Sequence, residues 1–199
     1  MRPSTAIVLV FVACGAAAAQ RPSCEEVTAL AQMVRSKSAA ALVRLKRQAG
    51  DSYRAKIVFA FRRFELKPTD VPSARAVLDL IPNTEEQDSD WHTFGDSLCD
   101  SETVQDMAAL SRLGDRLPHD LARAVLLVPD KMPEYVSYAR LSVQDPHGDY
   151  AERMRAVCRA KRAQFLRAVG GLAEQEKTWF VSHVFNPDGC QPLALPEAE

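Results

Sequence analysis

The sequence lacks the short motifs that most often reveal a protein's chemistry. It contains no G-x-G-x-x-G and no G-x-x-x-x-G-K-[ST], the glycine-rich loops that hold nucleotide phosphates. It has no G-x-S-x-G and no S-x-x-K in a plausible context, so no serine nucleophile is recognisable. It has no C-x-x-C pair, which argues against a thioredoxin-like redox site and a zinc knuckle. We therefore predict no catalytic residue, no cofactor and no metal, and the sequence favours binding over catalysis.

The chain also lacks a large net charge. It has no apolar run long enough to span a membrane, because even the apolar core near its N-terminus is too short. Its 25 Lys and Arg nearly balance its 26 Asp and Glu, for a net charge of −1. Such a chain is not drawn to nucleic acid by its overall charge, and its basic segments have no interleaved aromatic residues. We expect no nucleic-acid partner and no transmembrane segment after export.

The N-terminus has the pattern of an export signal. Arg2 is followed by an apolar core at residues 6–13 and by the small residues 17–19, which predicts a signal peptide over residues 1–19 and a mature chain beginning at Gln20. The protein is then periplasmic or extracellular, and its composition favours a bacterial source. Residues 11–14 also resemble a lipoprotein box, and in that alternative Cys14 carries a lipid anchor.

In either interpretation Cys14 is not available for a disulfide, which leaves an even number of cysteines in an oxidising compartment. If the last two helices fold back at Gly170-Gly171, Cys190 reaches Cys158, which leaves Cys24 to pair with Cys99. Four cysteines allow three pairings, and the fold-back favours this one.

Apolar residues recur at helical spacing through almost the whole chain, and no strand pattern is convincing. We predict an all-α fold, an irregular bundle of seven or eight helices built from helical hairpins and stapled by disulfides, with residues 20–190 as one domain and 191–199 as a loose tail. The expected helices cover residues 24–48 with a break near 36–38, 52–66, 73–81, 101–113, 121–128, 134–143, 149–169 and 173–185. Residues 83–90 are expected to form an acidic exposed loop or frayed helix, and residues 91–99 are ambiguous.

Capping residues, glycine and proline indicate where the expected helices begin and end. Ser23 and Glu26 form a capping box, Gly50 is expected to end one helix and Asp51 to cap the next. Pro118 is expected to be the first residue of a new helix. Residues 74–82 resemble residues 122–129, and this echo suggests a short HEAT-like stack as an alternative architecture.

Charge is distributed in blocks. Residues 35–67 and 153–167 are basic, and residues 70–120 are acidic. We expect these blocks to neutralise one another across the folded surface. The alternative is a dipolar surface that steers a charged partner.

Four side chains are candidates for a metal or acid–base cluster, because each of two histidines precedes a carboxylate at an expected helix start. They are His119, Asp120, His147 and Asp149. The simpler interpretation is that the two aspartates lie in first turns, favoured by the helix dipole. The sequence does not show whether the four converge. We expect His183 at the edge of the core, and Lys161 on an otherwise apolar helix face.

These observations favour an exported helical interaction or scaffold module that binds a protein partner. A cell-envelope hydrolase acting on wall glycan or peptide is the first alternative. An inhibitor or immunity protein directed against a secreted toxin is the second.

Overall fold

The computed structural model describes residues 22–96, 98–100, 103–141, 149–185 and 190. Within these residues all regular structure is helical, as the sequence predicts, and the helices number ten rather than seven or eight. They are α1 (Cys24–Arg35), α2 (Ala39–Ala49), α3 (Tyr53–Leu66), α4 (Val71–Leu78), α5 (Glu85–His92), α6 (Val104–Leu127), α7 (Met132–Leu141), α8 (Asp149–Ala160), α9 (Arg162–Gly170) and α10 (Glu174–His183), with 3-10 turns η1 (Thr93–Gly95) and η2 (Pro129–Lys131). The expected signal peptide, the Gln20 cut, Cys14 and the 191–199 tail lie outside the described residues.

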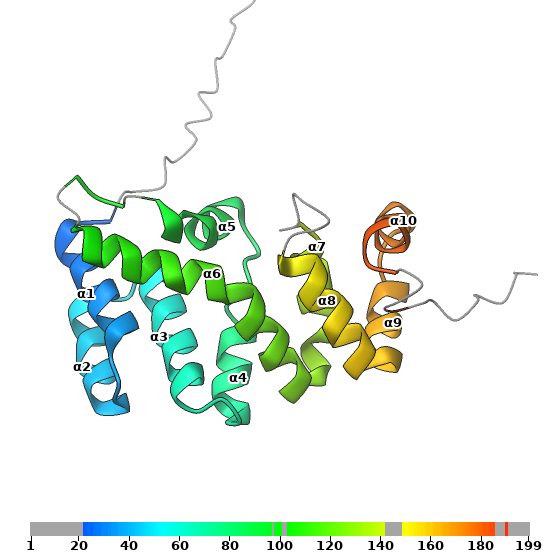
Figure 1. The fold of residues 1–199 in the computed structure, drawn as a ribbon, viewed down its shortest axis with the longest axis horizontal. Helices are drawn as coiled ribbons and strands as arrows, with labels where there is room; N and C mark the ends of the chain where they lie inside the picture. The colour runs from blue at the N-terminus through cyan, green and yellow to red at the C-terminus, as the bar shows by residue number, and fades with distance from the viewer. Residues whose placement is uncertain (1–21, 97, 101–102, 142–148, 186–189, 191–199) are drawn as a thin grey trace, which may run out of the picture.

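The helices form a row that is crossed by one long helix. Helices α1 to α4 stand side by side, each packing on the next one or two, and α6 runs diagonally over them (Figure 1). Beyond α6 lie α7, α8 and α9, with α10 packed against α9. None of the helices in the described part is both long and apolar enough to cross a bilayer.

Short polar side chains begin most of the helices, because the first backbone N–H groups need acceptors. The Ser23 hydroxyl accepts from the Glu26 N–H at 3.2 Å, and Ser38 caps α2 in the same way. The break expected near residues 36–38 therefore separates α1 from α2. The α3 cap is Ser52 rather than Asp51, since Asp51 is exposed and pairs with Lys46 instead.

Gly50 ends α2 as expected, with a φ of 74°. A residue with a side chain rarely adopts this backbone conformation without strain, so glycine fits the sharp reversal from α2 to α3.

Proline does not divide α6, contrary to the two helices expected around Pro118. Helix α6 runs unbroken for 24 residues, although Pro118 cannot donate to the carbonyl of Gly114. Pro118 and its neighbours Leu117 and Leu121 are buried, and α6 packs against α1, α4 and α8. Burial along both halves therefore outweighs the lost bond, and α6 changes direction near its middle (Figure 1).

The acidic stretch 83–90 was expected to be a loop or frayed helix, but it forms most of α5. Thr84 caps the helix through the Gln87 N–H, and Trp91 is buried near its end. The Trp91 indole donates to the Tyr53 hydroxyl at 2.9 Å and packs edge-on against Phe61. The buried Trp91 thus anchors α5, a short acidic helix that the spacing of its own apolar residues does not predict.

The single helix expected over residues 149–169 is two helices, α8 and α9, which meet at Lys161. Lys161 has φ −136° and ψ 49°, outside the helical region. A continuous helix would place this lysine among Val157, Cys158 and Phe165, all buried. The break leaves Lys161 half-buried while those three residues stay in the core.

The echoed segments are also not equivalent. Residues 74–78 end the separate helix α4, whereas residues 122–127 end the long helix α6. The echo therefore does not correspond to a repeated helical hairpin.

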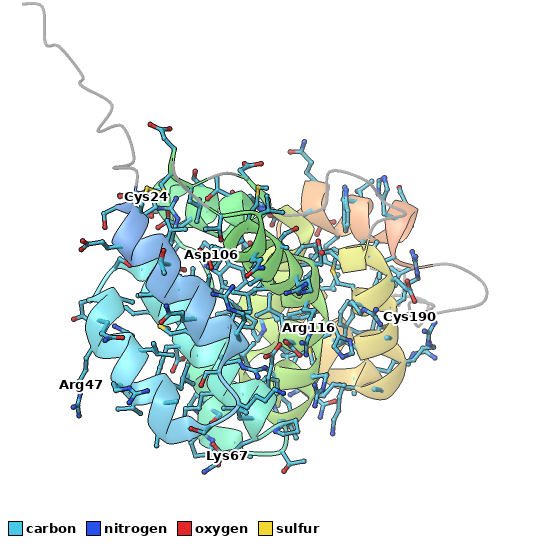
Figure 2. All side chains as sticks on the ribbon, turned by 60° about the vertical axis from the view of Figure 1, so that its left-hand side comes forward. Cys24, Arg47, Lys67, Asp106, Arg116 and Cys190 are labelled. Carbon is cyan, nitrogen blue, oxygen red and sulfur yellow. A yellow bond between two sulfur atoms is a disulfide. The ribbon has the colours of Figure 1, made fainter. Side chains whose placement is uncertain are left out.

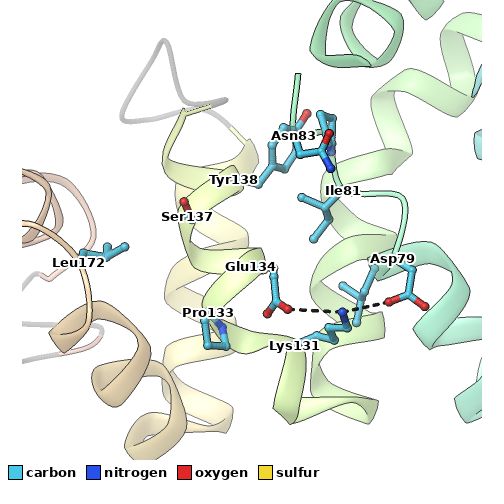
Figure 3. A pocket seen from close by; sticks show the side chains of 11 residues that line it. Asp79, Ile81, Asn83, Lys131, Pro133, Glu134, Ser137, Tyr138 and Leu172 are labelled. Carbon is cyan, nitrogen blue, oxygen red and sulfur yellow. Dashed lines mark hydrogen bonds and ion pairs between the residues drawn. The ribbon is translucent and has the colours of Figure 1, made fainter. Parts of the chain in front are cut away.

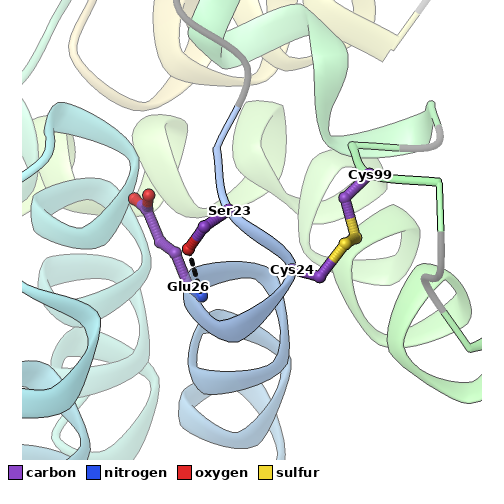
Figure 4. The surroundings of a disulfide bond; sticks show 4 residues. All are labelled: Ser23, Cys24, Glu26 and Cys99. Atoms are coloured by element: carbon purple, nitrogen blue, oxygen red, sulfur yellow. Dashed lines mark hydrogen bonds between the residues drawn. A yellow bond between two sulfur atoms is a disulfide. The ribbon is translucent and has the colours of Figure 1, made fainter.

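Both predicted cysteine pairs lie at disulfide distance. The Cα atoms of Cys24 and Cys99 are 5.5 Å apart, and those of Cys158 and Cys190 are 5.9 Å apart. Figure 4 shows Cys24, beside the Ser23 cap, joined to Cys99 on the segment that leads into α6. The second pair ties the last turn of α8 to Cys190 after α10, as predicted, although residues 149–169 form two helices and not the single arm of a hairpin.

Candidate functional site

The largest of the cavities described here is an open groove of 680 Å³ between the end of α4 and the outer face of α7. We call it the α4–α7 groove (Figure 3). Its lining comes from three segments that are far apart in the sequence. These residues are Leu78, Asp79, Ile81, Pro82, Asn83, Lys131, Pro133, Glu134, Ser137, Tyr138 and Leu172.

The charged groups of the α4–α7 groove satisfy one another. The Lys131 Nζ lies 3.0 Å from Asp79 Oδ1 and 3.4 Å from Glu134 Oε1 (Figure 3). The hydrogen bond to Asp79, reinforced by Glu134, raises the pKa of Lys131. Lys131 therefore stays protonated and is a poor nucleophile or base.

Ion pairing also holds the two walls together. Arg75 on α4 makes a two-armed contact with the Asp130 carboxylate in η2, at 2.8 and 3.1 Å. Like the Lys131 pairs, this contact is largely exposed, so each contributes little to the free energy of unfolding. Together the pairs fix the spacing between α4 and the start of α7.

The remaining surface of the groove is mostly apolar, with Asn83 and Ser137 as its uncharged polar side chains. Leu78 and Tyr138 are buried, and Ile81, Pro82 and Leu172 are half-buried. The carbonyl of Leu80 accepts a hydrogen bond from the Tyr53 hydroxyl, which holds the extended segment before Pro82 in place. A preformed groove with apolar walls and neutralised charges suits a bound segment of another molecule better than a reacting substrate.

A second group of ionisable residues lies inside the protein, between α3 and α6. Asp120 is 0% exposed, and its Oδ2 has no hydrogen-bond partner within the described residues. Burial, followed by the nearby charge of Glu65, raises the pKa of Asp120 from 3.8 to about 6. Arg123 lies 3.5 Å from the other oxygen, Oδ1.

Glu65 faces the same region, but its negative charge is balanced by two arginines. Its side chain is 6% exposed and pairs with Arg62 on its own helix and with Arg116 on α6 at 2.9 Å. Two neighbouring carboxylates, one with a raised pKa, are what a glycoside hydrolase needs. Glu65 lines a cavity of 340 Å³ together with Arg62 and Arg116, but Asp120 lines none of the described cavities, so a substrate in that cavity would not meet both carboxylates.

Of the four candidates for a metal or acid–base cluster, the structure describes the side chains of His119 and Asp120 alone. His119 and Asp120 are consecutive in α6, and they point in different directions: His119 is exposed and Asp120 is buried. Partial burial, with the charges of Arg153 and other arginines, lowers the pKa of His119. His147 lies outside the described residues, and for Asp149 only the backbone is described.

No group of three or more potential metal ligands occurs among the described residues. His183 is half-buried, as expected for the core edge. Its ring stacks on Trp179 with centroids 4.8 Å apart, and its Nδ1 lies 2.8 Å from the Trp179 carbonyl oxygen.

The charge blocks meet in part as predicted. Arg35 and Arg54 of the first basic block pair with Asp106 and Asp90 of the acidic block, at 2.7 and 2.6 Å. In the second basic block, Arg155 donates instead to the backbone carbonyl of His183.

Sequence reasoning missed the α4–α7 groove. Asp79 and Lys131 belong to different helices and to no motif, so only the packing of α4 near α7 brings them together. Comparison of the chain with protein families, with curated proteins and with solved structures finds no match.

Proposed function

We propose that this protein is an exported binding module that holds a segment of a protein partner in the α4–α7 groove. The observation that carries the proposal is the chemistry of the groove: it is large and partly apolar, and its lysine is neutralised by two carboxylates. The two disulfide pairs are compatible with export, because such bonds persist in oxidising compartments.

The hydrolase alternative receives less support from the same observations. Of its best acidic pair, Glu65 lines a cavity of 340 Å³ but is held by two arginines, and Asp120, whose pKa is raised, lies in the interior. An enzyme needs ionisable groups that converge on an accessible cavity. An inhibitor or immunity protein would be a special case of the proposed binding module.

A cross-linking experiment followed by a binding measurement tests the proposal. A photoreactive residue is placed at Ser137, on the groove wall, and for comparison at Gln164, an exposed position on α9. We expect a specific adduct from position 137 and none from position 164 in the exported protein.

The segment found by cross-linking is then synthesised, and its binding is measured to the unmodified protein and to the variants Ser137→Trp and Gln164→Trp. Ser137→Trp, which fills the groove, should weaken binding at least tenfold, whereas Gln164→Trp should bind like the unmodified protein. Equal adducts from both positions, or unchanged binding by Ser137→Trp, would reject the groove as the site.

A further inference from the structure

The hairpin of α2 and α3 carries a second, smaller groove at the end of the helical row. This cavity has a volume of 200 Å³, and we call it the α2–α3 groove. Its floor is apolar, and its rim on α3 is cationic. The lining residues are Ala39, Leu42, Val43, Phe59, Arg63, Leu66 and Lys67.

The floor is recessed. Leu42 is buried, and Phe59 and Leu66 are half-buried. Val43 is 44% exposed, which is unusual for a large apolar side chain in the described part of this protein. Helices α2 and α3 run antiparallel around Gly50, so Val43 on α2 lies opposite Phe59 on α3. A trough between two antiparallel helices is the shape into which the ridge of a third helix packs.

The two helices that form this groove carry mostly positive charge, and the nearest acid on the α3 side is Asp70, whose pKa is lowered by Ser73 and by the charges of Lys67 and Arg63. Helix α2 has no acidic residue, and the one acid of α3, Glu65, is buried and held by arginines. Six exposed cations on the hairpin and its flanks form no ion pair within the described residues. They are Lys37, Arg44, Arg47, Lys56, Arg63 and Lys67.

Two of these cations, Arg63 and Lys67, line the groove, and the other four lie elsewhere on the hairpin and its flanks. Lys56 and Arg63 recur at seven-residue spacing and so share one face of α3, and Lys67 follows directly after the last residue of that helix. Arg47 lies one turn after Val43 on α2. Figure 2 shows Arg47 and Lys67 projecting from the outer edge of the molecule. The nearest acids are at the ends: Asp51 pairs with Lys46, and Asp70 caps α4 through Ser73.

We propose that the α2–α3 groove binds an acidic amphipathic helix of a partner protein. Its apolar stripe lies on Val43, Phe59 and Leu66, and its carboxylates face Arg63 and Lys67 on the α3 rim. A membrane surface fits less well, because membrane-binding faces present bulky apolar residues that protrude, and this floor is recessed. The site shares no lining residue with the α4–α7 groove, so it stands independently of the proposed function.

The probe is a synthetic fluorescent helix of about 20 residues with leucine on one face and glutamate on the others. A peptide of the same composition in scrambled order is the control for charge alone, and vesicles of phosphatidylglycerol are the control for a membrane. Binding to the full-length oxidised protein is measured by fluorescence anisotropy.

We expect the amphipathic helix to bind at least tenfold more tightly than the scrambled peptide. Val43→Glu, and separately Arg63→Glu with Lys67→Glu, should each weaken binding at least tenfold. The matched control is Arg159→Glu with Arg167→Glu, which changes the net charge equally at exposed positions on α8 and α9. It should bind like the unmodified protein.

Circular dichroism shows that each variant is folded before binding is compared. Three results overturn the proposal: equal binding of the ordered and scrambled peptides, an equal loss in the control variant, or binding to vesicles with no binding of the helix.

Discussion

The guanidinium of Arg54 on α3 lies 2.6 Å from the carboxylate of Asp90 on α5, and both side chains are nearly removed from water, at 11% and 12% exposure. Burial raises the pKa of Asp90 even though the charge of Arg54 opposes this. The Arg54 Nε also has no partner within the described residues. The loss of hydration is therefore only partly offset by the pair.

Removal of Arg54 alone should be much more costly than removal of both partners. Arg54→Met leaves the Asp90 carboxylate buried without its cation, and we expect a loss of about 3 kcal/mol in the free energy of unfolding. Arg54→Met with Asp90→Leu should recover most of that loss. Urea denaturation measures both, with Lys46→Met, which breaks an exposed pair and should lose under about 1 kcal/mol, as the control. If the double variant is as unstable as the single one, the pair is net stabilising.

Asp120→Asn should stabilise the protein at neutral pH. The folded-state pKa of Asp120 is raised from 3.8 to about 6, so between these values the folded protein keeps a proton that the unfolded chain has released. Stability from this group is therefore present below about pH 4 and is lost as the pH rises through 6. At 1.36 kcal/mol for each pKa unit, the gain at pH 7.5 is on the order of 1–3 kcal/mol.

The measurement is the urea midpoint of Asp120→Asn and of the unmodified protein from pH 4 to 7.5. Their difference should grow with pH and nearly vanish at pH 4. Asp115→Asn, at an exposed position of the same helix, should show no such pH dependence. A constant difference at all pH values would mean that packing, rather than ionisation, distinguishes the variant.

Each disulfide should stabilise the fold, and the longer loop should contribute slightly more. Cys24 and Cys99 are separated by 75 residues, and Cys158 and Cys190 by 32. Replacing either pair with alanine should lower the free energy of unfolding by about 2–4 kcal/mol, with the first pair costing about 0.7 kcal/mol more in the chain-entropy model. Non-reducing peptide mapping should find both links, and a link between Cys24 and Cys158 would contradict the hairpin of the C-terminal helices.

Local signals in the sequence predict the helices that form independently of distant contacts. Ser23, Ser38 and Gly50 act within a few residues of their own positions, so their roles follow from the sequence alone. The predicted disulfide pairs lie at disulfide distance, but the fold-back that suggested them assumed one helix over residues 149–169, whereas the chain also turns at Lys161 between α8 and α9.

Tertiary contacts decide what the sequence does not reveal. Pro118 breaks isolated helices, but burial along α6 on several neighbours overrides that preference. The acidic α5 is helical because Trp91 anchors it and Arg54 neutralises Asp90. The α4–α7 groove combines residues from three separate segments, and no spacing along the chain encodes that meeting.

The mature protein should begin at Gln20. This prediction rests on the apolar core at residues 6–13 and the small residues 17–19, which have the pattern of a signal peptide and its cleavage site. Intact-mass analysis of protein secreted by an expressing bacterium measures the N-terminus directly. A diacylglyceryl adduct on Cys14 would instead establish the lipoprotein alternative.

Arg35→Gln should destabilise the protein at neutral pH and have little effect in acid, a pH dependence opposite to that of Asp120. Arg35, in the last turn of α1, reaches Asp106 in the first turn of α6, with Nη2 2.7 Å from Oδ1. Burial alone would raise the pKa of Asp106, but hydrogen bonds from Arg35 and Thr103 and the Arg35 charge together lower it. A lowered folded-state pKa contributes stability above the ordinary aspartate pKa, and this contribution is lost as the pH falls through the folded value.

Because the Arg35 side chain is 40% exposed, solvent screens the pair, and we expect a loss of only about 1 kcal/mol at pH 7. The difference from the unmodified protein should shrink below pH 3, where Asp106 becomes protonated, and in molar sodium chloride. Urea denaturation at pH 7 and pH 3 measures it, and Arg159→Gln, at an exposed position on α8, is the control and should show no such pH dependence. A loss that persists at pH 3 would assign the effect to the Arg35 hydrogen bond with the Gln105 carbonyl, at 3.2 Å, instead of to the charge on Asp106.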